Sequence, residues 1–164
     1  MVYNMFDALT RPVVGVLTLA VLASCSSTSS SVCTKPGAAL NQVNEQMFFI
    51  KNAKQAGVQK SPLGYQYKIV HQGKGTQHPK SGDTVVVNYV TRKLNGTVID
   101  SGSSAALPVS KVIEGWKLAL SEMVEGDSWL VYVPAKLAYG CKSQPSNSGY
   151  DEALMFDMEL LKIQ

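Results

Sequence analysis

The spacing of apolar and polar positions divides the chain into one helix followed by a series of strands. From residue 38 to about residue 56, apolar side chains recur every three or four positions, which is the repeat of an amphipathic helix. The apolar stripe of this helix consists of Leu40, Val43, Met47 and Ile50. We expect the stripe to pack on the chain's own domain or, as the alternative, on a second copy in a weak homodimer. Gly57 is placed to end the helix.

After Pro62 the repeat shortens to two, which is the period of a half-buried strand. Strand patterns occupy residues 65–69, 84–91, 98–100, 128–134 and 154–160. Asn95-Gly96 lies between the second and third of these segments and favours a hairpin with a type I′ turn. A short helical pattern covers residues 113–123. Mostly antiparallel strands with one short helix predict an α+β domain.

The first 24 residues have the pattern of an export signal. Residues 12–23 form an uncharged apolar run after Arg11, and this run is too short for a membrane span of about 20 residues. The run ends in the sequence LASC at Cys25, which resembles a bacterial lipobox. In lipoproteins of this kind the chain is cleaved before the cysteine, which is then acylated. The alternative is a buried core helix that carries a cysteine by coincidence.

These patterns predict four parts of the chain. They are a signal peptide (1–24), a Ser-rich tether (25–37), a helix with its linker (38–61) and the sheet domain (62–164). Acyl chains on Cys25 would contribute about 0.8 kcal/mol per buried methylene, which is enough for a stable membrane anchor. Because Ser26 follows the cysteine, we expect an outer-membrane lipoprotein of the bacterial envelope that faces the periplasm or the cell surface.

Composition narrows the classes of function. The 164 residues are 45% hydrophobic and 16% charged, which argues against disorder over most of the chain. The net charge is +3 with no block of five or six like charges, so we expect no nucleic-acid partner. His71 and His78 have no cysteine or carboxylate nearby to complete a ligand set, and we expect neither a metal nor a cofactor.

Cys33 and Cys141 are the two cysteines that remain once Cys25 is acylated. An exported chain enters an oxidising compartment, where the two can form a disulfide between the end of the tether and the loop after Tyr139. Two separate thiols are the alternative, and the sequence leaves both open.

Six motifs follow one another in the strand-rich part of the chain. They read GYQYK, DTVVVNY, LNGTVIDS, VIEGW, GDSW with a later LAYG, and a closing strand from residue 154 to 163. In this order the motifs resemble those of the FKBP-type peptidyl-prolyl isomerases. The lipobox and the preceding helix resemble the bacterial macrophage infectivity potentiator-like subgroup. The resemblance covers residues 62–164 and implies a twisted antiparallel sheet, or half-barrel, wrapped around a short central helix.

The resemblance implies catalysis of rotation about the bond that precedes proline. The barrier to this rotation is about 18–20 kcal/mol and arises from amide resonance. A catalyst therefore needs no nucleophile and no metal, only an apolar pocket that binds the twisted amide better than the planar one. Its partners would be proline-containing polypeptides, and its role would be to assist the folding of exported proteins.

The resemblance also assigns roles to individual residues. The catalytic set is Asp100, Ile113, Trp116 and Tyr139. The substrate-binding set is Tyr89, Ile99, Leu107, Val112 and Phe156. Trp116 would form the floor under the proline ring, and Asp100 would lie at the polar rim. The Ile113 N–H and the Tyr139 hydroxyl would donate hydrogen bonds to substrate carbonyls.

The chain departs from the family pattern at several pocket positions. Ile99 replaces an aromatic residue, Leu107 stands where phenylalanine is common, and Gln144 stands where histidine is frequent. Residues 148–151 read SGYD in place of the family's IPPN. Each lost apolar contact would cost roughly 1 kcal/mol. A second function class therefore stays open, namely a catalytically weak or inactive lipoprotein that acts as a chaperone or an envelope binding module.

Overall fold

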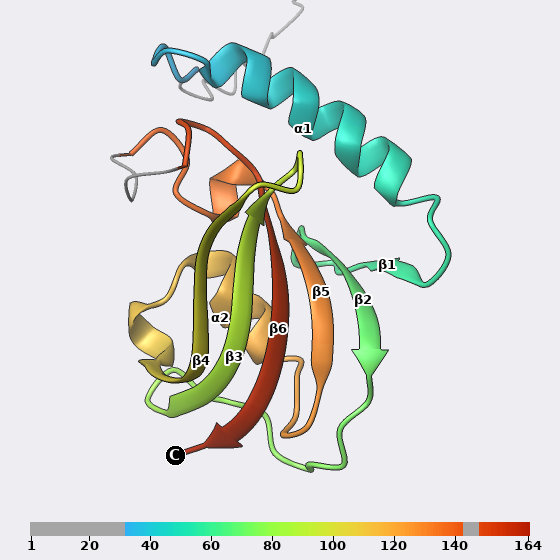
Figure 1. The fold of residues 1–164 in the computed structure, drawn as a ribbon, viewed down its shortest axis with the longest axis vertical. Coiled ribbons are helices and arrows are strands. Elements are labelled where there is room, and N and C mark those ends of the chain that lie inside the picture. Colours follow the sequence, from blue (N-terminus) through green and yellow to red (C-terminus); the bar gives the residue numbers. More distant parts are fainter. Residues whose placement is uncertain (1–31, 143–147) are drawn as a thin grey trace, which may run out of the picture. The chain divides into compact units, whose positions relative to one another are not determined.

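The computed structural model describes residues 32–142 and 148–164 (Figure 1). The signal peptide, the lipidated Cys25 and residues 25–31 of the tether, all predicted from sequence, lie outside the described residues, as does Gln144. In the described ranges, no helix has both the length and the apolar character needed to cross a bilayer.

Six antiparallel strands form one sheet in the order β1-β2-β5-β6-β3-β4 (Figure 1). The strands are β1 Val58–Lys60, β2 Gln66–His71, β3 Thr84–Lys93, β4 Val98–Pro108, β5 Ser128–Val133 and β6 Leu154–Ile163. The helices are α1 Ala38–Asn52 and α2 Glu114–Leu120, with short 3₁₀ turns η1 Val109–Lys111 and η2 Ala135–Leu137. The predicted α+β fold is confirmed.

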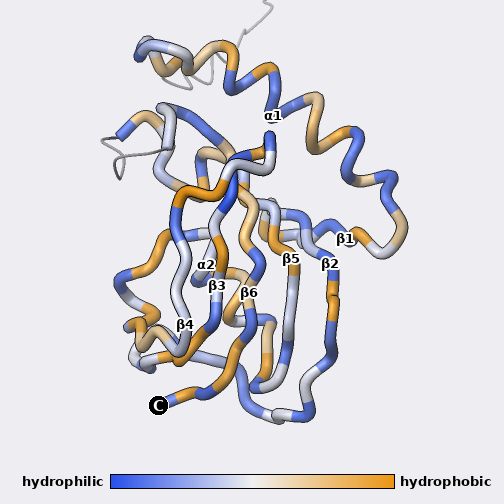
Figure 2. The backbone as a smooth tube through the Cα atoms, in the orientation of Figure 1, coloured by the Kyte–Doolittle hydropathy of each residue, from blue (hydrophilic) through white to orange (hydrophobic). Residues whose placement is uncertain are grey.

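The core lies between the sheet and α2. Every second residue of β5 and β6 is buried, in keeping with the alternation of hydropathy that can be followed in Figure 2. From α2, Trp116, Ala119 and Leu120 complete this core. A Cβ atom on Gly115 would lie only 2.4 Å from a methyl carbon of Val133, so glycine is required for α2 to approach β5 this closely.

The predicted hairpin at Asn95-Gly96 joins β3 to β4, but its turn is not type I′. That turn needs a positive φ at both central residues, whereas Gly96 has φ +89° and Asn95 does not have a positive φ. The Gly96 N–H donates to the Lys93 carbonyl (2.9 Å), and the Lys93 N–H donates to the Thr97 carbonyl (2.9 Å). This is the pattern of a longer turn that ends in a left-handed glycine.

Helix α1 ends at Asn52, earlier than the expected residue 56. Asn52 is buried, and its side-chain amide donates to Oε1 of Gln66 (2.9 Å). The Gln66 amide in turn donates to the carbonyl of Phe49 in the last turn of the helix (3.0 Å). These bonds satisfy polar groups at the helix end, and the chain then turns to Gly57, which has φ +80°.

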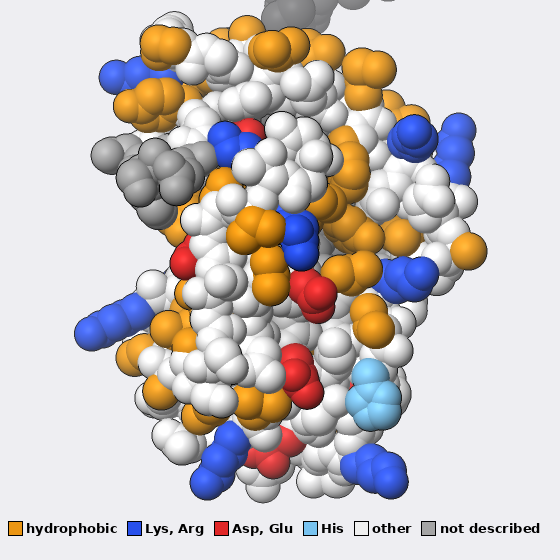
Figure 3. Space-filling view, viewed as in Figure 1, with side chains coloured by type: hydrophobic (Ala, Val, Ile, Leu, Met, Phe, Trp, Pro, Cys, Tyr) orange, Lys and Arg blue, Asp and Glu red, His pale blue; other side chains and the backbone are white. Residues whose placement is uncertain are grey.

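The predicted apolar stripe of α1 is exposed, so the expectation that it packs on its own domain is wrong. The exposed fractions are 65% for Leu40, 53% for Val43, 67% for Met47 and 66% for Ile50. Hydrophobic side chains gather on the surface over α1 in Figure 3. The opposite side of α1 faces the domain. There the Asn41 amide and the Glu45 carboxylate bond backbone groups, the Gln42 amide bonds the Asp151 carboxylate, and the Phe48 ring contacts Tyr132.

Candidate functional site

A pocket of about 190 Å³ opens between β3, β4, β6 and α2. It is lined by Tyr89, Thr91, Asp100, Leu107, Lys111, Val112, Ile113, Trp116, Tyr139 and Phe156. Of the residues predicted from sequence, only Ile99 is not among the lining residues; it is partly buried and packs against the core. The sequence analysis missed Thr91 and Lys111, which belong to no motif that it used.

Strand register brings the pocket residues of the sheet together. Thr91 on β3 lies opposite Asp100 on β4 and opposite Phe156 on β6. Residues that lie opposite each other on antiparallel strands share a face of the sheet. Tyr89 is two residues from Thr91 and therefore has its side chain on the same face. Three strands thus supply one wall of the pocket.

Three aromatic rings meet around Trp116. The indole lies edge-on to the Tyr89 ring, with centroids 5.2 Å apart at 84°, and edge-on to the Phe156 ring, at 5.5 Å and 85°. Trp116 is only 4% exposed, and its indole N–H has no hydrogen-bond partner among the described residues. Perpendicular rings of this kind form a rigid apolar surface, which suits a small saturated ring.

Gly102 on β4 makes room for one of these rings. It lies opposite Tyr89, and a Cβ atom at this position would lie 2.5 Å from Cε1 of the tyrosine. The sequence analysis did not assign Gly102 a role. A glycine inside a strand pattern is the signal that could have found it, because such glycines mark the close approach of another group.

The rim of the pocket carries Asp100 and two tyrosines. The Tyr89 hydroxyl donates to Oδ2 of Asp100 (3.0 Å), and Oδ1 accepts the Ser101 N–H (2.9 Å). Burial and then this hydrogen bond raise the pKa of Tyr89. Burial, followed by the charge of Asp100, raises the pKa of Tyr139. Both phenols therefore keep their protons at neutral pH and can donate hydrogen bonds.

Besides the Trp116 indole N–H, two further donors at the pocket are unpaired among the described residues. Neither the Tyr139 hydroxyl nor the backbone N–H of Ile113 makes a hydrogen bond within residues 32–142 and 148–164. Ile113 directly precedes α2 with an extended backbone, so its N–H lies outside the helical hydrogen-bond ladder. An amide ligand in the pocket would find two available donors and an apolar floor.

Segment 148–151, which replaces the family's IPPN, contributes no lining residue to the pocket. Among the described residues, the pocket therefore has no wall from this segment. The segment is nevertheless attached to the loop that carries Tyr139, because the Asp151 N–H donates to the Gly140 carbonyl (2.8 Å).

Two larger hollows lie elsewhere on the described surface. One, of about 820 Å³, lies between the loop of residues 74–80 and Gln164. There His78 Nδ1 is bonded to the Met123 carbonyl (2.9 Å). The other, of about 590 Å³, lies beside α1 and β2. Neither is lined by the three perpendicular aromatic rings of the smaller pocket. No cluster of metal-ligating side chains occurs in the described ranges.

Residues 75–161 match the sequence profile of the FKBP-type peptidyl-prolyl cis-trans isomerases. The chain belongs to this family. The chain is similar to the peptidyl-prolyl cis-trans isomerase Mip of Coxiella burnetii, with 40% identity over 76% of this chain and 55% of that protein. It is also similar to the macrophage infectivity potentiator of Trypanosoma cruzi, with 30% identity over 98% of this chain and 85% of that protein.

Solved structures agree with this assignment. The crystal structure of FkpA from Escherichia coli has a TM-score of 0.72 and 34% identity over 77% of this chain and 61% of that one. The chain spans about half the length of the first curated relatives that it matches.

Proposed function

We propose that this chain catalyses cis–trans isomerisation of X–Pro peptide bonds. The observation that carries the proposal is the 190 Å³ pocket, in which Trp116 is buried between two perpendicular rings and two donors are unpaired. The proline ring of a substrate would rest on Trp116. The Ile113 N–H and the Tyr139 hydroxyl would bind the carbonyls on either side of it.

The proposed mechanism is selective binding of the twisted amide. Rotation removes the resonance between the carbonyl and the proline nitrogen, so the twisted amide is less polar than the planar one. The twisted amide therefore loses less solvation free energy when it moves from water into an apolar pocket. The apolar walls Val112 and Phe156 favour that form, and Asp100 with Tyr89 bounds the site on its polar side. No covalent bond forms and no group acts as a general acid or base.

Trp116→Ala tests this proposal in the purified full chain with a short X–Pro peptide. The uncatalysed reaction takes tens to hundreds of seconds, so a modest acceleration is measurable. We expect Trp116→Ala to lower kcat/KM by about tenfold or more, because the floor of the pocket is removed. Val70→Ala, at an exposed position on β2, is the control and should not change the rate. A folded wild-type chain that leaves the peptide at its uncatalysed rate would contradict the proposal.

We further propose that the chain assists the folding of exported proteins from a lipid anchor on Cys25, in the outer membrane. The LASC sequence supports this location, and one relative, from Legionella longbeachae, is called an outer membrane protein. The intact mass of the chain made in a bacterial host should show cleavage before Cys25 and added acyl groups. Cys25→Ser should abolish both and release the chain from the membrane fraction.

A second candidate function is binding without useful catalysis. Two observations favour it: segment 148–151 adds nothing to the pocket, and α1 exposes a stripe of large apolar side chains. In this case the chain would suppress aggregation of an unfolded client equally well with and without Asp100→Ala. Loss of that protection in the variant would tie the effect to the pocket instead.

The same stripe supports a weak homodimer through α1. Met47→Glu, which puts a charge into the stripe, should shift sedimentation toward the monomer. An unchanged, concentration-independent monomer in the wild-type chain would exclude this pairing.

A further inference from the structure

The buried side of α1 contacts the two loops next to the pocket. One is the Tyr139 loop, residues 135–142, and the other is segment 148–151. The side chains of Asn41, Gln42 and Glu45 each form a hydrogen bond with one of these two loops.

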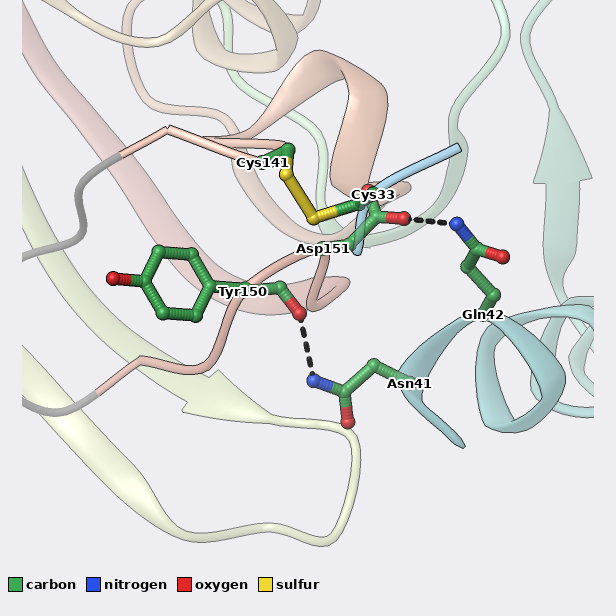
Figure 4. Close-up of a disulfide and its surroundings, with 6 residues drawn as sticks. All are labelled: Cys33, Asn41, Gln42, Cys141, Tyr150 and Asp151. Atoms are coloured by element: carbon green, nitrogen blue, oxygen red, sulfur yellow. Dashed lines mark hydrogen bonds between the residues drawn. A yellow bond between two sulfur atoms is a disulfide. The ribbon is translucent and has the colours of Figure 1, made fainter. Parts of the chain in front are cut away.

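The Tyr139 loop is attached to the N-terminal region at both of its ends. At the start, the Ala135 N–H donates to the Glu45 carboxylate (2.8 Å). Near the end, Cys141 forms a disulfide with Cys33, which lies just before α1 (Figure 4). This resolves the alternative that the sequence left open for the two cysteines. Tyr139 lies between these two attachments.

Segment 148–151 is attached to the first turns of the same helix. The Asn41 amide donates to the Tyr150 carbonyl (2.9 Å), and the Gln42 amide donates to the Asp151 carboxylate, as Figure 4 shows. A Cβ atom on Gly149 would lie 2.9 Å from the Asn41 amide nitrogen. The glycine therefore leaves room for the Asn41 amide in the position from which it bonds Tyr150.

The two loops are also joined to each other. The Asp151 N–H donates to the Gly140 carbonyl, next to Tyr139, and the Gly140 N–H donates to the Ala135 carbonyl (2.9 Å). Asp151 has φ +53°, which is unfavourable for a non-glycine residue, and its bonds to Gln42 and Gly140 hold it there. A continuous set of bonds thus runs from α1 through segment 148–151 to the residue beside Tyr139.

We propose that Asn41, Gln42 and Glu45, together with the Cys33–Cys141 disulfide, are positioning elements for the Tyr139 hydroxyl. This inference rests on the proposed isomerase function. The family's proline pair stiffens the loop before the last strand, and this chain lacks it. Helix α1 supplies the missing rigidity from outside the domain. The Tyr139 hydroxyl is then already placed to donate to a substrate carbonyl, so no conformational entropy is lost in ordering the loop at each turnover.

The test compares the two sides of α1 in the full chain. Asn41→Ala/Gln42→Ala removes the bonds to segment 148–151. Asn44→Ala/Gln46→Ala makes the same substitutions at exposed positions of the same helix. We expect the first variant to lower kcat by about fivefold or more with little change in KM, as for the loss of one or two hydrogen bonds. The control variant should keep the wild-type rate.

A double-mutant cycle separates positioning from general stability. If α1 acts through the Tyr139 hydroxyl, Asn41→Ala/Gln42→Ala should have little further effect in a Tyr139→Phe background. Glu45→Gln, which keeps an acceptor for the Ala135 N–H, should restore the rate that Glu45→Ala loses. The proposal is overturned if Asn41→Ala/Gln42→Ala lowers the rate by the same factor in the Tyr139→Phe background as in the wild type. It is also overturned if the control Asn44→Ala/Gln46→Ala lowers the rate as much as Asn41→Ala/Gln42→Ala does.

Amide hydrogen exchange keeps the test independent of activity. In the wild-type chain the Gly140 and Asp151 amides should be protected, and Asn41→Ala/Gln42→Ala should speed their exchange about fivefold while the control does not. Unchanged exchange overturns the positioning role, even in an active enzyme. If the wild-type chain has no isomerase activity but Asn41→Ala/Gln42→Ala still exchanges these amides faster than the wild type, the proposed function is rejected and the attachment by α1 stands.

Discussion

The sheet and α1 differ in what holds them in the fold. On β6, Leu154, Met158 and Leu160 are fully buried, and the charged residues between them are more exposed. On α1 the stripe of Leu40, Val43, Met47 and Ile50 faces solvent, and the side toward the domain carries amides and a carboxylate beside Phe48, whose ring contacts Tyr132. The sheet is therefore stabilised mainly by removal of apolar surface from water, whereas α1 depends to a larger extent on directional bonds and one covalent link.

This difference has a consequence for how each region responds to change. Apolar burial is insensitive to redox state and has no directional requirement. The attachment of α1 depends on particular donors and acceptors and on an oxidised cysteine pair. We expect the sheet to set the global stability and α1 to adjust the loops beside the pocket.

The largest effect, on the free energy of unfolding, is expected for a buried methionine of the sheet, and an exposed methionine of α1 provides the comparison. Met158→Ala removes a fully buried side chain from β6 and should lower the free energy of unfolding by about 2–5 kcal/mol. Met47→Ala makes the same change on a side chain that is 67% exposed, and should cost less than about 0.5 kcal/mol. Denaturant titration of both variants checks the prediction. Similar losses would mean that the α1 stripe is buried in solution, as in a dimer.

Removal of the disulfide should have the next largest effect. Cys33→Ala/Cys141→Ala opens a link between residues 108 positions apart and should lower the free energy of unfolding by about 2–4 kcal/mol. Thermal melting of the variant beside the oxidised wild type measures this, with reductant as the second arm. Reductant should destabilise the wild type but leave the variant unchanged. Equal melting temperatures for all samples would argue against the pairing.

A smaller and more local effect is expected at Gly102. Gly102→Ala would put a methyl group 2.5 Å from the Tyr89 ring, so the ring must shift away from Trp116. We expect kcat/KM to fall by about tenfold, with a loss of stability of about 1–3 kcal/mol. Gly82→Ala is the matched control, because a Cβ atom there meets nothing within 4 Å. A wild-type rate in Gly102→Ala would show that the position of Tyr89 does not matter for catalysis.

The smallest effect is expected from pH. The pKa values of Tyr89 and Tyr139 are both raised, so the protonated form of each phenol is favoured and is lost only as pH rises above the ordinary value near 10. The isomerisation rate should therefore be nearly constant between about pH 6 and 9. A rate profile across this range checks it. A fall in kcat/KM below pH 9 that Tyr139→Phe removes would contradict it.

Much of the pocket was predictable because its residues occur in short motifs. Trp116 and Ile113 belong to one such motif, and Asp100 to another, so local sequence was enough to name them. Thr91 was not predictable in this way, because it reaches the pocket only through its register with Asp100 and Phe156. Ile99 shows the converse, since it is adjacent to Asp100 in a motif but packs against the core.

The sequence by itself determined five of the six strands, the two helices, the position of the hairpin and most of the pocket, because each depends on a repeat or motif within a short window; the short strand β1 was not predicted. Only the tertiary structure decided which side of α1 is buried, that Cys33 meets Cys141, and that the loops beside Tyr139 are attached to a helix about 100 residues earlier in the chain. A period of 3.6 residues shows that a helix has two sides. The partners that each side meets are brought together only when distant parts of the chain fold against each other.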